Sequence, residues 1–183
     1  MTKKKKWSGD DGHTDYLGKG RVEKSSPRIE TLGSLDESSA ALGMARAFCR
    51  DTSTTQLIEN IQRKLYRLMS EAAAGLENSP QFPGITDKDV AWLEKEIHGL
   101  EKILTIPQDF ILPGTTTYSA ALDLARTVVR RAERRLVEST KIGDYQNPEG
   151  LKFLNRLSTL IFYLEIKEIS SYPHLHPLLA KEI

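Results

Sequence analysis

The hydrophobic positions between residues 119 and 140 repeat with the period of an α-helix. At about 100° per residue, the small and apolar residues fall on one arc, as expected of a side that packs into a core. They are Ala121, Ala125, Val128, Val129, Ala132 and Leu136. Arg126, Arg130 and Glu133 share a second arc, only about 60° wide by the same geometry. The segment therefore predicts one helix with a smooth core-facing side and a separate line of guanidinium groups.

Two interpretations of this arginine line remain open from the segment alone. A solvated stripe, with Arg130 and Glu133 paired at i,i+3, is the usual role of such a charge run. The alternative is that the guanidinium groups meet an anionic ligand, with Glu133 as the single carboxylate among them.

Four further segments have helical periodicity. They are residues 34–50, 55–76, 86–104 and the segment that begins at 147. Ser34 and Glu37 have the spacing of a capping box, and Asn147-Pro148 is a typical N-cap and first helical residue. The last segment is apolar on nearly every side, which favours a central position. Five helices, short connections and no convincing strand predict an all-α fold, a five-helix up-and-down bundle of the ferritin-like kind.

The first 33 residues show no clear periodicity and contain a glycine-rich loop. Four glycines fall within twelve residues, among Asp, Ser and Thr; they are Gly9, Gly12, Gly18 and Gly20. Glycine lets the backbone approach a ligand closely, and successive N–H groups in such a loop can bind an anion. A simple surface turn is an equally good interpretation of the loop by itself.

The loop at residues 107–114 is unusually apolar. Loops normally run over the surface, yet this one contains Phe110, Ile111 and Leu112. These side chains either plug the end of the bundle or line an apolar pocket. Asn155, on the last helix, needs hydrogen-bond partners if it is buried. The pair His174 and His176 is a weak metal-binding pattern.

The composition narrows the functional classes. The 183 residues carry a net charge of +1, so nothing global favours a nucleic acid or a membrane as partner. The one cysteine, Cys49, excludes an internal disulfide and favours a reducing, cytoplasmic location. No apolar run approaches the roughly 20 residues of a membrane span. No histidine has a glutamate three residues before it, a pattern that di-iron bundles need.

Taken together in order and spacing, several segments resemble the PduO-type ATP:cob(I)alamin adenosyltransferases. They are residues 8–12, 18–24, 27–33, 36–37, 42–43, 110–114, 125–127, 130–134 and 155–158. The resemblance runs nearly end to end and stops around residue 165. Its most specific part combines the arginine block, the Asn-Arg-Leu-Ser block at residues 155–158 and the glycine loop.

The resemblance implies that the bundle assembles as a homotrimer, with ATP held between subunits. The implied reaction transfers the 5′-deoxyadenosyl group of ATP to the cobalt of reduced cobalamin and releases triphosphate, with Mg²⁺ bridging phosphate oxygens. The implied partners are a corrinoid reductase or a cobalamin-dependent acceptor enzyme. The chain would then divide into a glycine-rich nucleotide-binding segment (1–33), a helical bundle domain (34–170) and a C-terminal tail (171–183), one domain in all.

The same resemblance assigns roles to individual residues. Those implied in nucleotide binding are Lys6, Trp7, Ser8, Gly9, Asp10, Gly12, Thr14, Asp15, Lys24, Arg130, Arg131, Glu133, Arg134 and Asn155. Those implied in corrinoid binding are Asp36, Phe110 and Arg126, and these three together with Arg130 are the implied catalytic residues. Asp36 matches a position that pairs with Arg126, and Phe110 matches an aromatic side chain at the lower face of the cobalt. No metal ligand is firmly assigned; Glu133 is the candidate for contact with Mg²⁺.

The chain departs from the family's usual residues at several motif positions. They include Ser38, Ser39, Thr115, Asp123 and Thr159. The two serines lie on the implied corrinoid side. An alternative function is therefore a non-catalytic paralogue that binds ATP or a corrinoid for delivery or sensing. A third is a bundle that binds neither and serves a structural or interaction role.

Overall fold

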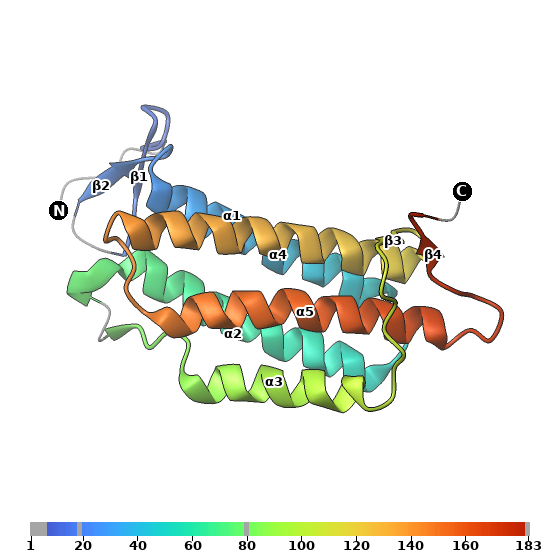
Figure 1. Cartoon of the computed structure of the whole chain (residues 1–183). Helices are drawn as coiled ribbons and strands as arrows, with labels where there is room; N and C mark the ends of the chain where they lie inside the picture. The colour runs from blue at the N-terminus through green and yellow to red at the C-terminus, as the bar shows by residue number, and fades with distance from the viewer. Residues whose placement is uncertain (1–6, 18–19, 79–80, 182–183) are drawn as a thin grey trace.

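Five helices run alternately up and down in the computed structural model, which describes residues 7–17, 20–78 and 81–181 (Figure 1). They are α1 (Pro27–Phe48), α2 (Thr52–Asn78), α3 (Asp87–Glu101), α4 (Thr117–Lys141) and α5 (Pro148–Ser170). The α4 helix packs on α1 and α5, α2 packs on α1, and α3 packs on α5. The predicted all-α, five-helix up-and-down bundle is therefore confirmed.

The small-residue side of α4 faces the core, as its periodicity predicts. Ala125, Val129 and Ala132 have no exposed surface. Short side chains let neighbouring helices approach closely. Larger residues of the other helices, among them Leu35, Leu65 and Phe153, fill the core around them. Among the described helices, none combines the length and the apolar composition that a membrane crossing requires.

The first helix begins earlier than the sequence predicts. It starts at Pro27, whose fixed φ suits the first helical position, so Ser34 is buried inside the helix and is not a cap. The extra turns are held against the end of α4, where the hydroxyl of Thr31 contacts the carbonyl of Arg135 at 3.0 Å and the hydroxyl of Ser139 at 2.8 Å. The last residues of the predicted 1–33 segment therefore belong to the bundle.

The expectation of no strand was wrong in two places. An antiparallel hairpin pairs β1 (His13–Asp15) with β2 (Arg21–Glu23), and a second ladder pairs β3 (Ile111–Leu112) with β4 (Leu178–Leu179). These strands have only two or three residues. Segments that short cannot show the two-residue alternation from which a strand is predicted.

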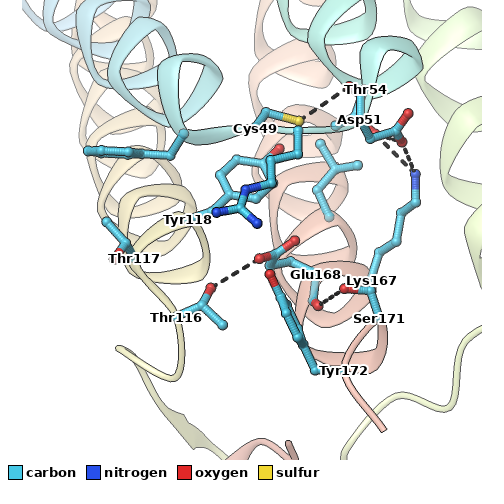
Figure 2. A pocket seen from close by; sticks show the side chains of 13 residues that line it. Cys49, Asp51, Thr54, Thr116, Thr117, Tyr118, Lys167, Glu168, Ser171 and Tyr172 are labelled. Carbon is cyan, nitrogen blue, oxygen red and sulfur yellow. Dashed lines mark hydrogen bonds and ion pairs between the residues drawn. The ribbon is translucent and has the colours of Figure 1, made fainter.

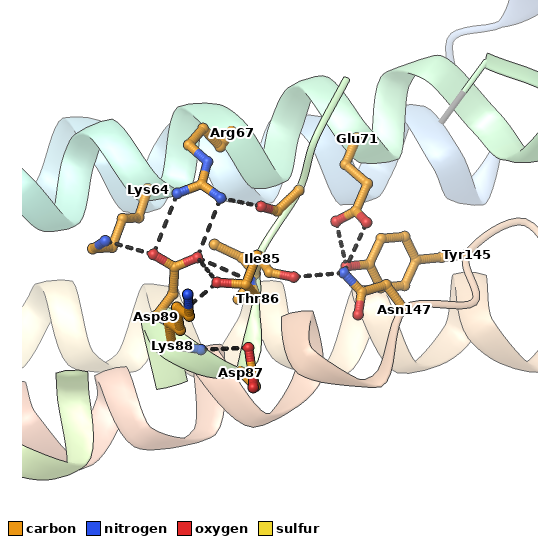
Figure 3. A network of polar contacts seen from close by, with 11 residues as sticks. Lys64, Arg67, Glu71, Ile85, Thr86, Asp87, Lys88, Asp89, Tyr145 and Asn147 are labelled. Atoms are coloured by element: carbon orange, nitrogen blue, oxygen red, sulfur yellow. Dashed lines mark hydrogen bonds and ion pairs between the residues drawn. The ribbon is translucent and has the colours of Figure 1, made fainter. Parts of the chain in front are cut away.

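A polar network fixes the start of α3 against α2 (Figure 3). Asp89, nearly buried, accepts hydrogen bonds from Lys64 at 2.6 Å and Arg67 at 3.2 Å. It also accepts from the N–H and the hydroxyl of Thr86, in a capping box. One carboxylate thus caps a helix and compensates two cations, and α3 begins where the 86–104 periodicity predicts it.

A neighbouring network fixes the start of α5 (Figure 3). Glu71 accepts hydrogen bonds from the Tyr145 hydroxyl and the Asn147 amide, each at 2.8 Å. Asn147 also donates to the carbonyl of Ile85 at 2.9 Å, and its own oxygen caps the helix, as predicted. A Cβ at Gly84 would lie 1.8 Å from the Glu71 carboxylate, so only glycine lets this loop pack so closely.

The Asp89 network predicts acid-sensitive stability. Burial by itself raises the pKa of Asp89, but hydrogen bonds from Lys64 and Thr86 outweigh it and hold the pKa well below its usual value. Since the folded-state pKa is lowered, the stabilisation is present above the unfolded pKa and is lost as pH falls. We expect Asp89→Asn to lower the free energy of unfolding at pH 7 by about 2 kcal/mol, measured by urea denaturation.

The difference between Asp89→Asn and the unmodified protein should shrink below pH 4. Asp87→Asn is the matched control, because Asp87 lies on the same turn but is exposed. An equal loss of stability in the two variants at pH 7 would contradict the assigned role of Asp89.

Candidate functional site

The arginine line of α4 borders a hollow on the surface of the bundle. The hollow has a volume of about 440 Å³ and is lined by Arg130, Glu133, Arg134, Val137 and Lys141. Arg130 and Arg134 are exposed. Three cations and one carboxylate therefore surround a space large enough for a phosphorylated ligand.

Arg130 is an arginine of this surface whose guanidinium has no partner among the described residues. The guanidinium of Arg134 donates to the backbone carbonyl of Arg130 at 3.0 Å. Arg131 turns away to α1, where it pairs with Glu37. Among the described residues, no hydrogen bond or ion pair engages the guanidinium of Arg130. A free guanidinium in fork geometry suits bidentate contact with phosphate oxygens.

Asn155, on α5, lies beside the arginine face of α4, the surface formed by Arg130, Glu133 and Arg134. It is exposed, so it is not the buried core residue considered from the sequence. Its amide donates to Glu133 at 3.1 Å, and its oxygen accepts from Arg156 at 3.0 Å. The fold therefore brings Arg130, Glu133 and Asn155 together from α4 and α5, although 22 positions separate Glu133 from Asn155.

The described part of the glycine-rich segment comprises the β1–β2 hairpin and the turn before it, held together by two cations of the same segment. Arg21 contacts both oxygens of Asp11, at 2.7 and 2.9 Å, and also reaches the carbonyl groups of Ser8 and His13. The Arg21 hydrogen bonds hold the pKa of Asp11 well below its usual range. Lys24 donates to the carbonyl of Gly9 at 2.6 Å.

The other predicted nucleotide residues of this segment lie on β1 or in the turn that precedes it. Trp7 is 70% exposed, Gly12 has a φ of 79° that suits glycine, and Thr14 and Asp15 are in β1. Lys6 lies outside the described residues. The hairpin sits at the end of the bundle where α1 begins and α4 ends (Figure 1).

The implied pair of Asp36 and Arg126 is not formed within one chain. Arg126 instead donates to Asp123, from Nε at 2.8 Å and Nη2 at 2.7 Å. Asp123 lies one turn earlier on the same helix, the spacing at which opposite charges pair readily. Asp36 is exposed on α1.

Phe110 is held on the surface by the C-terminal tail. The β3–β4 ladder and a hydrogen bond from the Ala180 N–H to the Phe110 carbonyl at 2.8 Å fix this loop. Phe110 is 87% exposed and Leu112 is 50% exposed. The interpretation that this loop plugs the bundle is therefore wrong, because the pairing with the tail keeps it outside the helix ends.

A cavity of about 710 Å³ lies where α1 ends and α4 begins (Figure 2). Lys167 crosses it to Asp51 at 2.8 Å and Thr54 at 3.0 Å, and Thr116 donates to Glu168 at 3.3 Å. None of the predicted site residues lines it. Its walls come from four helix ends that are distant in the sequence, so no local motif could predict it.

Comparisons with known proteins place these features in a family. The family model described as cobalamin adenosyltransferase matches residues 5–168. A corrinoid adenosyltransferase PduO of Citrobacter freundii is 37% identical over 159 residues, covering 86% of this chain and 47% of that protein. A corrinoid adenosyltransferase of Mycobacterium tuberculosis is 34% identical, covering 86% of this chain and 83% of that protein. The chain spans about half the length of the PduO relatives it matches.

Solved structures show the same fold. A variant of the PduO-type ATP:corrinoid adenosyltransferase from Lactobacillus reuteri, complexed with cobalamin and ATP, matches with a TM-score of 0.88 and 26% identity. The match covers 97% of this chain and 99% of that one. A second variant from Lactobacillus reuteri, complexed with ATP, matches with a TM-score of 0.87 and 27% identity, covering 97% of this chain and 99% of that one.

The contacts of Arg21 predict that this residue orders the glycine hairpin. We expect Arg21→Ala to accelerate amide hydrogen exchange in residues 8–15 by roughly tenfold, because local opening then breaks fewer contacts. Exchange in the helices should not change. Arg50→Ala serves as the control, since Arg50 is an exposed arginine far from the hairpin. Unchanged exchange in residues 8–15 of Arg21→Ala would show that the hairpin is ordered by something else.

Proposed function

Because this chain belongs to the cobalamin adenosyltransferase family, we propose that it transfers the 5′-deoxyadenosyl group of ATP to the cobalt of a reduced corrinoid. The observation that carries the proposal is the arginine face of α4. There the uncommitted guanidinium of Arg130 lies beside the hydrogen-bonded pair of Glu133 and Asn155. The names of the relatives and the ligands of the Lactobacillus reuteri structures support it.

The proposed chemistry is a displacement at the C5′ carbon of ATP. The reduced cobalt supplies the electron pair for the new cobalt–carbon bond, and the bond between C5′ and the phosphate oxygen breaks. Triphosphate leaves with that second electron pair, so negative charge grows on the leaving group. Arg130 and Arg134 would stabilise this charge, because preorganised donors act most strongly where charge develops.

The other nucleotide contacts follow from the geometry. Glu133 and Asn155 present a carboxylate and an amide that can hold ribose hydroxyls, and the N–H groups of the glycine hairpin can hold phosphate oxygens. Mg²⁺ would be carried mainly by the phosphate oxygens. Glu133 is the one carboxylate that lines the hollow, which fits this arrangement, because Mg²⁺ usually takes one or two protein carboxylates beside phosphates.

The corrinoid would bind beside Phe110, Arg126 and Asp36. An exposed aromatic side chain on a fixed backbone can cover the lower face of the cobalt and keep water from it. Reduction of the corrinoid requires an electron donor, so a reductase is the expected partner. The free thiol of Cys49 is compatible with the reducing, cytoplasmic location expected from the sequence.

We propose that the functional unit is a homotrimer in which the glycine hairpin of one copy completes the arginine face of the next. The exposure of Arg130 and the hollow beside it support this arrangement. A second candidate function is a non-catalytic paralogue that binds ATP or a corrinoid for delivery or sensing. The pairing of Arg126 with Asp123 favours it, since that pairing changes the corrinoid side.

Replacement of Arg130 tests the proposed role directly. We expect Arg130→Ala to lower kcat/KM for ATP by about 10²- to 10³-fold, as loss of a charge-stabilising donor typically does. The measurement is the anaerobic absorbance change as adenosylcobalamin forms from cob(I)alamin and Mg-ATP. Arg135→Ala is the control, because Arg135 lies on α4 but pairs with Glu138. Comparable losses in the two variants would contradict the assignment of the triphosphate to Arg130.

Mixed subunits test the shared site. The Arg130→Ala chain has an impaired arginine face but an intact glycine hairpin. The Lys24→Ala chain has an impaired hairpin but an intact arginine face. If each site uses two copies, random 1:1 mixing of the two inactive variants should restore about a quarter of the sites. Activity is measured after the variants are unfolded and refolded together. Failure of the mixture to exceed either variant alone would show that one chain supplies both parts.

A further inference from the structure

Glu165 is a buried carboxyl group without a hydrogen-bond partner. It lies on α5, is 1% exposed, and neither of its oxygens is hydrogen-bonded by any described residue. A buried carboxylate without compensation is costly, so such groups are normally paired or neutral. The bundle core does not need a carboxyl group here, because an apolar residue would fill the position at lower cost. A role for this carboxyl group is therefore expected in its interaction with the residues around it.

The neighbours are the two charged residues on the corrinoid side of α4. The α4 and α5 helices pack against each other in antiparallel register, with Glu133 bonded to Asn155, and this register sets Asp123 opposite Glu165. Asp123 and Arg126 are also the charged groups that act on Glu165. Burial first, and then the negative charge of Asp123, raise the pKa of Glu165 to about 7, while Arg126 acts in the opposite direction. One guanidinium thus lies near two carboxyl groups and is bonded to only one of them, Asp123.

The other charged contacts of α5 are committed elsewhere. On the α3 side, Glu94 contacts Arg156 and Glu101 contacts the Tyr163 hydroxyl. Near the end of α5, Lys167 contacts Asp51 just before α2. Glu168 accepts a hydrogen bond from Thr116 at the start of α4. Of the charged groups on the elements around α5, Asp123 and Arg126 are the ones that act on Glu165. The side chains of Arg126 and Asp123 are 28% and 13% exposed, so the pair is partly buried, while Glu165 is buried almost completely.

We propose that Glu165 is a positioning residue for Arg126. When the carboxyl group of Glu165 is ionised, it competes with Asp123 for the guanidinium of Arg126. With Glu165 neutral, Arg126 stays on Asp123 and keeps its remaining N–H groups toward the corrinoid side. With Glu165 ionised, the guanidinium is drawn into the bundle and that side loses positive charge. The effect on the corrinoid rests on the proposed function; the competition itself does not.

The kinetic consequence is a pH-dependent KM for the corrinoid. As pH rises from 6 to 8.5, KM for cob(I)alamin should increase by roughly three- to tenfold, because a charge-assisted contact is withdrawn. In Glu165→Gln, which cannot ionise, this increase should disappear. The KM for ATP should have the same pH dependence in both proteins. Glu168→Gln is the matched control, with the same chemical change one turn further along α5. An equal rise in the corrinoid KM with and without Glu165→Gln would overturn the proposal.

A stability cycle tests the competition without any activity. Since the folded-state pKa of Glu165 is raised, its contribution to stability is full below the unfolded pKa and is lost as pH rises through about 7. Glu165→Gln should therefore have the same Tm as the unmodified protein near pH 4 and a higher Tm at pH 8. In an Asp123→Asn background, Glu165 gains Arg126 as a partner, so the advantage of Glu165→Gln at pH 8 should vanish or reverse.

The two experiments separate the inference from the proposed function. Additive effects of Asp123→Asn and Glu165→Gln on Tm at pH 8 would overturn the competition. Absence of cobalt–carbon bond formation by the unmodified protein would refute the transferase and leave the stability cycle as the deciding measurement on Glu165.

Discussion

The close packing of α4 against α1 and α5 determines which side of α4 faces solvent. On the inner side of α4, Ala125, Val129 and Ala132 have no exposed surface. Because this side is fixed, the rotation of α4 is fixed, and the opposite arc must present Arg130, Glu133 and Arg134 outward. A helix with a less uniform small-residue side could turn by a few tens of degrees and bury part of that arc.

The candidate site follows from this rotation. Asn155 reaches Glu133 only because α5 lies along the same side of α4, and Thr31 fastens the start of α1 near the end of α4. The glycine hairpin leads directly into α1, so it is anchored at that end of the bundle. The proposed nucleotide residues Arg130, Glu133 and Arg134 and the proposed corrinoid residue Arg126 thus share α4, whereas Asp36 lies on α1 and Phe110 lies between α3 and α4. The α4 helix therefore links the two proposed substrate sites.

Local patterns in the sequence predicted the helices and the two sides of α4, because helical periodicity and caps such as Asn147 depend on near neighbours. The start of α1 was misplaced, since Thr31 and the residues around it are helical through contacts with α4 that lie over a hundred positions away. The partner of Arg126 could have been foreseen from the i,i+3 spacing to Asp123. Burial of Glu165 beside that pair could not, because it depends on how α5 meets α4.

In the proposed reaction, one adenosyl group moves from ATP to cobalt for each triphosphate released. The most direct measurement is therefore stoichiometric: the unmodified protein is given excess chemically reduced cob(I)alamin and limiting Mg-ATP under anaerobic conditions, and adenosylcobalamin and inorganic triphosphate are quantified together. Adenosyl transfer predicts equal amounts of the two products, each equal to the ATP consumed. Consumption of ATP without cobalt–carbon bond formation, or ATP binding without consumption, would contradict it.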